Sequence, residues 1–539
     1  MKKTMKRIPA LLVLGFLTVI FSACGDSQES AGGSNNAPSA SAPENGRATH
    51  LTFGCYNYSD SLDPATNTNS SWAGMRFGIT ESLFKFSKQV VAEPNICDEY
   101  TVSDDYRVWT LHIREGLKFS NGNAVNATAV RNSIQRLYDA TDAEKGGTGN
   151  SVPRGYLVYE SIVADDEAGT VTITCRNPTS NIPGILAYPY FAIIDTTVID
   201  KETIGTGPYK VAEFRPGVSI NVSRNEHYWN GEVPYDTVTI MFINDSSTKA
   251  MALQSGDIDL VENITTASDL DKLKADSNYH VSVAAGVRTA NAYMNFKGAL
   301  QNAALRQAIM MALDKKTMCE VTVGGMYTAG DSVLPSSLAY NYDKLNNPYP
   351  FNKQAAIDLL DKAGIVDTDG DGFRELDGKT INLDHVAFTS RNLDEFAEAV
   401  GLQLAAIGIK TTVNIRDYDT ALALLNAGEF DLWTCNTLTV GVGDPQDYLA
   451  NWYTGNSKSF GFYSSPEYDA AYEKLQVEVN ADRRLELITE LQQILIDDAA
   501  TIAYGYYNSS MISNVKKVTG AEIATIDYYW LTTEIRPVK

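Results

Sequence analysis

Residues 103–134 read SDDYRVWTLHIREGLKFSNGNAVNATAVRNSI and combine two kinds of local pattern. Within them, VWTLHIREGLKF (108–119) alternates apolar and polar residues, which predicts a strand, a turn and a second strand. The following stretch, NATAVRNSIQRLYD (126–139), carries apolar residues at helical spacing and predicts a helix. The sequence therefore predicts a strand pair that leads directly into a helix.

The rest of the chain repeats this interleaving of strands and helices. Strands are expected at 51–58 and 238–243, helices at 246–257, 304–321 and 482–499, and a helix, glycine turn and strand at 396–415. Such alternation predicts α/β lobes. Lobes of this kind bind ligands at strand ends and in the cleft between them.

Length and charge limit the class of protein further. With 539 residues, the chain is longer than one hydrophobic core usually serves, so several domains are expected. Its formal net charge of −22 argues against nucleic acid as a partner, because phosphate binding requires clustered Lys and Arg. The 29 tyrosines suit a cleft for ligands of mixed polarity, although tyrosines spread through strands would give the same count.

The N-terminus predicts export and membrane anchoring. A basic start, MKKTMKR, precedes 14 almost wholly apolar residues, too few for a membrane-spanning helix but typical of a signal peptide, here residues 1–23. Ser22-Ala23-Cys24-Gly25 resembles the lipobox of bacterial lipoproteins, which implies lipidation of Cys24; an ordinary secretory signal is the alternative. Residues 24–49 are rich in Gly, Ser, Asn and Pro and are expected to form a flexible tether.

Motifs for catalysis or cofactor binding do not occur in the sequence. The five histidines are scattered, and there is no HExxH, GxSxG or GxxxxGK pattern. The five cysteines other than Cys24 are expected to be small buried residues, with one disulfide as an open alternative. The loop DTDGDGFRELDG (367–378) begins like a calcium-binding EF-hand loop, but Gly378 stands where the twelfth-position Glu belongs. We therefore expect a turn before a strand, with calcium as the alternative, and predict a non-enzyme without cofactor or metal.

A series of motifs in order carries a resemblance to a known family. The opening stretch, with its acidic turn, Trp109, Ile113-Arg114, Lys118-Phe119 and glycine turn, resembles the signature of the family 5 extracellular solute-binding proteins, which serve ABC importers as oligopeptide, dipeptide and nickel receptors. Further matching stretches follow the same order: SLDP (61–64), IGTGPYKV (204–211), NEHYWNG (225–231), LQSGDIDL (253–260), LRQAIMMALDK (305–315), AAIDLLDKAGIVDTDGDG (355–372) and SSPEYDAAYEKL (464–475). The resemblance extends from about residue 50 to the C-terminus.

The resemblance implies a two-lobed α/β fold of the periplasmic-binding-protein type with an inserted domain. It places domain I at 50–81, 187–288 and 509–539, domain II at 82–186, and domain III at 289–508. The ligand would be held between domains I and III, with a hinge where the chain crosses near 289 and near 509.

The same resemblance implies which segments face the cleft. In peptide receptors of the family an acid lies a few residues before an Asp-Pro pair and binds the α-ammonium of the peptide, but residues 437–443 before Asp444-Pro445 contain no acid. Either Asp444 or Asp447 takes this role, or the ligand has no free amine there. The residues expected to contact ligand are Thr68, Asn69, Ser70, Trp72, Tyr418, Thr437, Asp444, Tyr504 and Tyr506.

The expected function is therefore a lipid-anchored, monomeric receptor on the extracytoplasmic face of the cell membrane. It would face the cell surface in a gram-positive host and the periplasm otherwise. It would capture oligopeptides and deliver them to ABC permease subunits driven by cytoplasmic ATPases. The alternatives are a receptor for a non-peptide or N-blocked solute, such as a sugar, opine or metal chelate, and a signalling lipoprotein on the same scaffold.

Overall fold

The structure, a computed structural model, describes residues 50–539 except 58, 199–202 and 457–459. The predicted signal peptide, Cys24 and the tether lie outside the described residues. Residues from Thr49 to the C-terminus form one compact unit. No helix in the described part of this unit is long and apolar enough to span a membrane.

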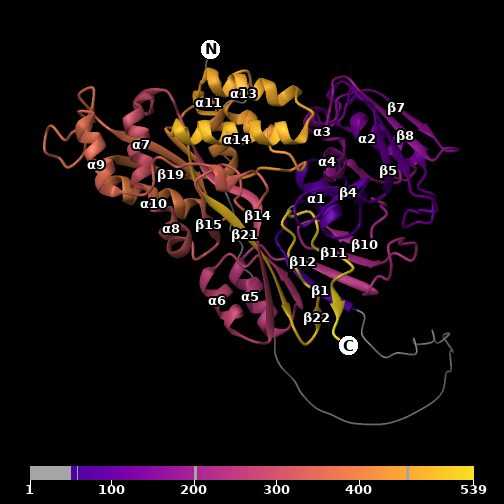
Figure 1. The fold of residues 1–539 in the computed structure, drawn as a ribbon. Coiled ribbons are helices and arrows are strands. Elements are labelled where there is room, and N and C mark those ends of the chain that lie inside the picture. The colour runs from indigo at the N-terminus through magenta and orange to yellow at the C-terminus, as the bar shows by residue number, and fades with distance from the viewer. Residues whose placement is uncertain (1–49, 58, 199–202, 457–459) are drawn as a thin grey trace, which may run out of the picture. The chain divides into compact units, whose positions relative to one another are not determined.

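Two long antiparallel strands organise the main sheet. They are β14 (Tyr279–Met294) and β21 (Thr501–Asn514), which lie side by side in Figure 1. Their pairing breaks between Ala285 and Thr289 of β14. Both predicted chain crossings, near 289 and near 509, fall within this strand pair.

Eleven strands make up the main sheet, in the order β10-β11-β12-β1-β13-β21-β14-β20-β18-β19, with β15 also paired to β21. The bounds of the strands not yet given are β1 (His50–Cys55), β10 (Tyr209–Arg215), β11 (Ser219–Arg224), β12 (Thr237–Phe242), β13 (Leu260–Glu262), β15 (Tyr327–Ala329), β18 (Asn382–Phe388), β19 (Lys410–Arg416) and β20 (Leu432–Leu438). Strand β1 is parallel to β12 and β13, and β18 is parallel to β19 and β20, whereas the pairs around β14 and β21 are antiparallel. The chain thus has the mixed α/β character that the sequence predicts.

Helices lie near both ends of the central strand pair. In Figure 1, α5 (Ser246–Ser255) and α6 (Ala267–Ala275) lie at one end of the β14–β21 pair, and α13 (Pro466–Val477) and α14 (Ala481–Asp497) lie toward the other. Further long helices include α1 (Thr68–Arg76), α7 (Ala303–Ala312), α9 (Lys353–Lys362), α10 (Leu393–Ala405) and α11 (Tyr418–Ala427).

A second, four-stranded sheet lies entirely within residues 82–186. Its order is β5 (Cys97–Val102), β6 (Val108–Ile113), β8 (Thr170–Cys175) and β7 (Tyr159–Asp165), and helix α2 (Ala127–Thr141) packs on β7 and β8. This sheet and helix occupy the segment predicted as domain II. The boundaries of the three domains remain a prediction.

Several local predictions are confirmed by the structure. Helix α2 begins after Asn126, whose side chain accepts a hydrogen bond from the amide of Ala129. Helix α5 ends at Gly256 with φ of 85°, a left-handed conformation that glycine adopts without strain. The cysteines at 55, 97, 175, 319 and 435 are buried and form no disulfide in the described part of the chain.

Other local predictions are wrong. The helix expected over 304–321 ends at Ala312, because Leu313 is extended and the Asp314 side chain caps a new short helix by accepting from the amide of Thr317. The second strand expected at 117–119 is only an isolated bridge between Lys118 and Ala124. The apolar run VTIMFI (238–243) suggests a buried strand, but β12 alternates between buried and exposed residues.

Candidate functional site

The break in the β14–β21 pairing directs Arg288 toward the C-terminal segment. Ala285 pairs with Asn508 and Thr289 with Tyr506, so three residues of β14 stand opposite Tyr507 alone. Such a bulge re-aims side chains that a regular ladder would hold in place. Here it places the Arg288 guanidinium against Asp527.

Asp527 binds two arginines at once. Arg288 Nε donates to Oδ2 of Asp527 at 3.1 Å, and Arg76 Nη2 lies 3.2 Å from the same oxygen. All three side chains are nearly buried. Burial alone would raise the pKa of Asp527, but the positive charges of Arg288, Arg76 and Arg391 outweigh it and lower the pKa to about 2. The carboxylate is therefore ionised at any physiological pH.

Aromatic rings surround this cluster. The Trp72 ring lies 4.9 Å from the guanidinium carbon of Arg76 and 5.5 Å from that of Arg288, within the range of cation–π attraction. The ring centre of Tyr528 lies 5.7 Å from the ring centre of Trp72 and 5.7 Å from that of Tyr188. Trp72, which the sequence predicts as a ligand contact, thus belongs to a mixed aromatic and cationic site.

Arg391 brings a third guanidinium from the segment before α10. Its guanidinium carbon lies 5.6 Å from the centre of the Tyr507 ring, and its backbone oxygen accepts from the Tyr327 hydroxyl at 2.7 Å. Its charge helps to lower the pKa of Asp527. The site therefore combines arginines from α1, from β14 and from the segment before α10. We refer to Arg76, Arg288, Arg391 and Asp527 as the arginine cluster.

The glycine-bearing stretch after β20 is packed against other parts of the chain. The carbonyl oxygens of Gly441, Val442 and Gly443 accept hydrogen bonds from Tyr528 Oη at 2.9 Å, Asn181 Nδ2 at 2.8 Å and Tyr340 Oη at 3.2 Å. Val440 and Val442 are buried in the same core as Trp72 and Tyr188. Side chains of the protein itself thus bind the backbone oxygens of Gly441, Val442 and Gly443.

Asp444 is paired inside the protein. Its Oδ2 lies 2.7 Å from Nη2 of Arg484, and both side chains are mostly buried. Tyr156 donates to the exposed Asp447 at 3.0 Å. Both acids line a cavity of about 260 Å³, whose wall also includes Tyr156, Asn181, Val442 and Arg484. An ammonium group at Asp444 would have to compete with Arg484.

Three more predicted residues lie at the start of α1. Thr68 Oγ1 is 2.9 Å from the hydroxyl of Tyr190, and the amide of Ser70 donates to the capping side chain of Asn67. Ser70 is buried, whereas Asn69 is exposed. The helix that carries these residues also carries Trp72 and Arg76, so it links them to the arginine cluster.

The remaining predicted residues lie in separate surroundings. Tyr504 and Tyr506 are fully buried, with hydroxyl contacts to Thr434 at 3.1 Å and to the backbone oxygen of Ser332 at 3.0 Å. Thr437, at the end of β20, is half-buried. Tyr418 is 55 % exposed and packs edge-on against Phe388, with 5.2 Å between the two ring centres. Among the described residues, no recorded contact joins Tyr418 to the arginine cluster.

Sequence reasoning missed the arginine cluster apart from its neighbour Trp72. Arg288 stood out in one respect, as a lone charge in the small and apolar run AGVRTANAYM (285–294). Arg391 and Asp527 gave no signal, because the contact joins segments that lie far apart in the sequence. Arg114 of the family signature has a structural role: its Nε donates to the Asn95 backbone oxygen at 3.2 Å and its guanidinium packs over Trp229.

Comparison with known proteins identifies the family. The family model described as bacterial extracellular solute-binding proteins, family 5 Middle, matches residues 91–460. A curated relative, the glutathione-binding protein GsiB of Shigella flexneri serotype 5b, is 26 % identical over 411 residues, covering 74 % of this chain and 73 % of that protein. GsiB of Escherichia coli K12 matches with the same identity and coverage.

Solved structures show the same fold. NikA from Brucella suis, in complex with Fe(III)-EDTA, superposes with a TM-score of 0.81 at 21 % identity, over 91 % of this chain and all of that one. DppA from Helicobacter pylori, in complex with the peptide STSA, gives a TM-score of 0.71 at 22 % identity, over 91 % of this chain and 98 % of that one. The fold is thus that of multidomain periplasmic binding proteins.

Proposed function

Since the chain belongs to the bacterial extracellular solute-binding proteins of family 5, we propose that it is the receptor of an ABC importer and captures a short peptide between domains I and III. The observation that carries the ligand class is the arginine cluster beside Trp72. Guanidinium groups bind carboxylates through paired, charge-assisted hydrogen bonds. Arg288 is the residue we assign to a carboxylate of the ligand.

The other end of the peptide has no matching acid. Residues 437–443 offer neutral side chains, Asp444 is bound to Arg484, and Asp447 accepts from the Tyr156 hydroxyl. A buried ammonium without a carboxylate partner is costly. The ligand is therefore recognised through its carboxylate rather than its amine. This favours an N-blocked peptide, or a non-peptide solute with carboxylates, as the second candidate.

The relatives are consistent with this range of ligands. The curated relatives are named for glutathione, and the solved structures include complexes with a peptide and with an Fe(III)-EDTA chelate. These ligands are known for those proteins only. They support a small amino-acid-derived or chelating solute for this chain.

Capture would use the strand pair β14–β21 as a hinge. The bonds from Tyr528 to Gly441 and from Asn181 to Val442 join the predicted domains I and II to domain III. These contacts would break on opening and re-form around the ligand, so binding energy that is realised only in the closed form would drive closure.

Anchoring and delivery complete the proposal. Lipidation of Cys24 would hold the monomeric receptor on the extracytoplasmic face of the cell membrane, with residues 24–49 as a tether. The receptor would then pass its ligand to permease subunits driven by cytoplasmic ATPases. A signalling role on the same scaffold would require ligand binding but no permease.

Native mass spectrometry of protein purified from its own cells tests the proposed function by identifying the trapped ligand. Calorimetry then compares a tripeptide with its N-acetylated and C-amidated forms. We expect amidation to abolish binding and acetylation to change the affinity less than about threefold. Loss of binding on acetylation alone would overturn the ligand assignment, and a trapped sugar or uncharged solute would overturn the peptide class.

A further inference from the structure

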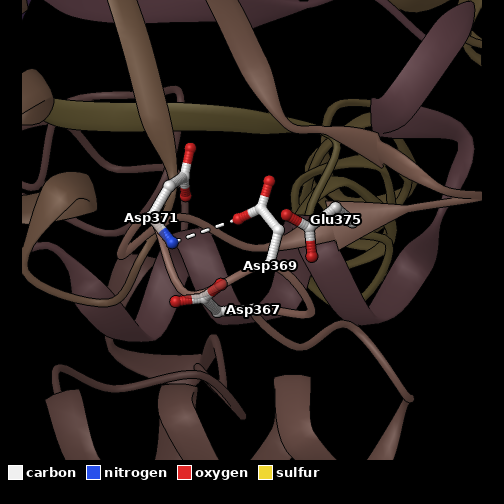
Figure 2. Close-up of side chains that lie close together, drawn as sticks. All are labelled: Asp367, Asp369, Asp371 and Glu375. Carbon is white, nitrogen blue, oxygen red and sulfur yellow. Dashed lines mark hydrogen bonds between the residues drawn. The ribbon is translucent and has the colours of Figure 1, made fainter.

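The loop between α9 and β18 brings four carboxylates together, far along the chain from the segments of the arginine cluster. Asp367, Asp369, Asp371 and Glu375 each offer one oxygen, and these four oxygens all lie within 4.8 Å of one another. Figure 2 shows that the four side chains lie close together. We refer to these four residues as the carboxylate cluster.

The backbone of the loop fixes the three aspartates. Asp367 accepts from the amides of Gly370 at 2.6 Å and Gly372 at 2.9 Å, Asp369 accepts from the amide of Asp371 at 3.1 Å, and Asp371 accepts from the amide of Phe373 at 2.8 Å. Gly370 and Gly372 have φ of 81° and 93°, which other residues adopt only with strain. The loop thus wraps around its own carboxylates.

Glu375 supplies an independent sign of a missing partner. Its side chain is buried, with the residue only 9 % exposed. One oxygen, Oε2, accepts from the amide of Thr368 at 2.7 Å and from its hydroxyl at 2.9 Å. The other, Oε1, is buried and has no hydrogen-bond partner among the described residues. A buried carboxylate oxygen without a partner is expensive, so a group that satisfies it is expected.

No cation of the described protein neutralises these four acids. The neighbouring Arg374 turns away, with Nη1 2.6 Å from Asp361 Oδ1 and Nε donating to the Ile407 backbone oxygen at 2.8 Å. No ion pair recorded for the described residues includes a member of the carboxylate cluster. Four like charges at this separation repel one another strongly unless a cation lies among them.

We propose that the carboxylate cluster is a calcium site. Hard oxygen ligands supplied by a flexible loop suit Ca²⁺, whereas Mg²⁺ requires a tighter octahedron and retains several waters. The sequence prediction of no metal rested on Gly378 at the twelfth position of the loop. The structure instead brings in the carboxylate of Glu375, which is the ninth residue of the loop when Asp367 is counted as the first. Bound calcium would fasten the hairpin of β16 (Glu375–Leu376) and β17 (Lys379–Thr380) to the end of α9.

Calorimetry and thermal melting of the full chain, first treated with EGTA and then titrated with CaCl₂, test this site. We expect one Ca²⁺ per chain and a higher melting temperature with calcium than with EGTA. Glu375→Gln and Asp369→Asn should each weaken calcium binding at least about tenfold. Glu398→Gln, an exposed change on α10 outside the cluster, should leave it unchanged.

Each possible outcome decides the proposal. Absence of a calcium-dependent heat and melting shift would overturn it, as would unchanged affinity in both cluster variants. Tighter binding of Mg²⁺ than of Ca²⁺ would overturn the choice of ion. Asp369 is exposed, so its variant is expected to fold even if Glu375→Gln does not. Peptide binding measured on the same samples should not depend on calcium loading, which separates this test from that of the proposed function.

Discussion

Arg288 donates through Nε to Oδ2 of Asp527 at 3.1 Å, which ties the bulge in β14 to the C-terminal segment. Arg76 reaches the same oxygen from α1. Because Asp527 fixes it within the protein, the Arg288 guanidinium is oriented before any ligand arrives. Such preorganisation lowers the entropic cost of binding.

Removing the negative charge of Asp527 should destabilise the fold. Asp527→Asn leaves the guanidinium groups of Arg76 and Arg288 nearly buried without their shared carboxylate, so we expect a loss of about 3 kcal/mol in the free energy of unfolding. Urea denaturation measures this loss. Asp271→Asn, an exposed change on α6, serves as the control and should cost less than about 0.5 kcal/mol. Equal effects of the two variants would show that the cluster adds nothing to stability.

The stability of the fold should fall in mild acid because of His385. Burial lowers the pKa of His385 to about 3, so the folded state keeps this side chain neutral. The unfolded chain takes up a proton below about pH 6.5, and stability therefore decreases as pH falls from 6.5 toward 3. Between pH 7 and pH 5 the expected loss is about 2 kcal/mol.

Denaturation curves at these two pH values check the contribution of His385. His385→Gln should remove most of the difference between them. His280→Gln, at a largely exposed position beside Glu522, should retain it. If the stability of His385→Gln still falls as much between pH 7 and pH 5, other titrating groups cause the loss.

The pair of Asp444 and Arg484 decides whether Asp444 holds a ligand amine. If the pair is structural, Asp444→Asn should cost about 2 kcal/mol of stability and change ligand affinity less than about threefold. A double-mutant cycle with Arg484→Met should then give a coupling of about 1–2 kcal/mol in stability. Loss of ligand binding in Asp444→Asn alone, with binding retained in Arg484→Met, would instead make Asp444 the amine partner.

The sequence predicts the scaffold better than the site. Apolar periodicity acts within a few residues, so the helices expected at 126–139 and 246–257 can be recognised in the sequence, and α2 and α5 confirm them. The helix over 304–321 was wrongly extended, since the capping ability of Asp314 competes with apolar periodicity. The site depends on contacts between distant segments. The family resemblance predicts Trp72 as a ligand contact, whereas Arg288 and Asp527 become partners only once the chain is folded.

The proposed membrane anchoring depends on a single residue, Cys24, which lies outside the described part of the chain. If Cys24 carries lipid, Cys24→Ala should move the protein from the membrane fraction to the soluble fraction of its host cells, because lipid chains supply the anchoring free energy. Fractionation followed by immunoblotting measures the distribution. A matched change at Cys97, Cys97→Ala, should leave the protein in the membrane fraction. Membrane retention and normal processing of Cys24→Ala would contradict the lipoprotein assignment.

Release of ligand should depend on the hydroxyl of Tyr528. Tyr528→Phe keeps the ring beside Trp72 and Tyr188 but removes the hydrogen bond to Gly441, a bond between the predicted domains I and III. The loss of about 1 kcal/mol from the closed form predicts about fivefold faster release in stopped-flow measurements. Tyr468→Phe is the matched control, because its buried hydroxyl donates to the Leu449 oxygen within domain III at 2.7 Å. Both variants should lose similar stability, but only Tyr528→Phe should release ligand faster. Equal release rates in the two variants would show that the bond from Tyr528 to Gly441 does not hold the closed form together.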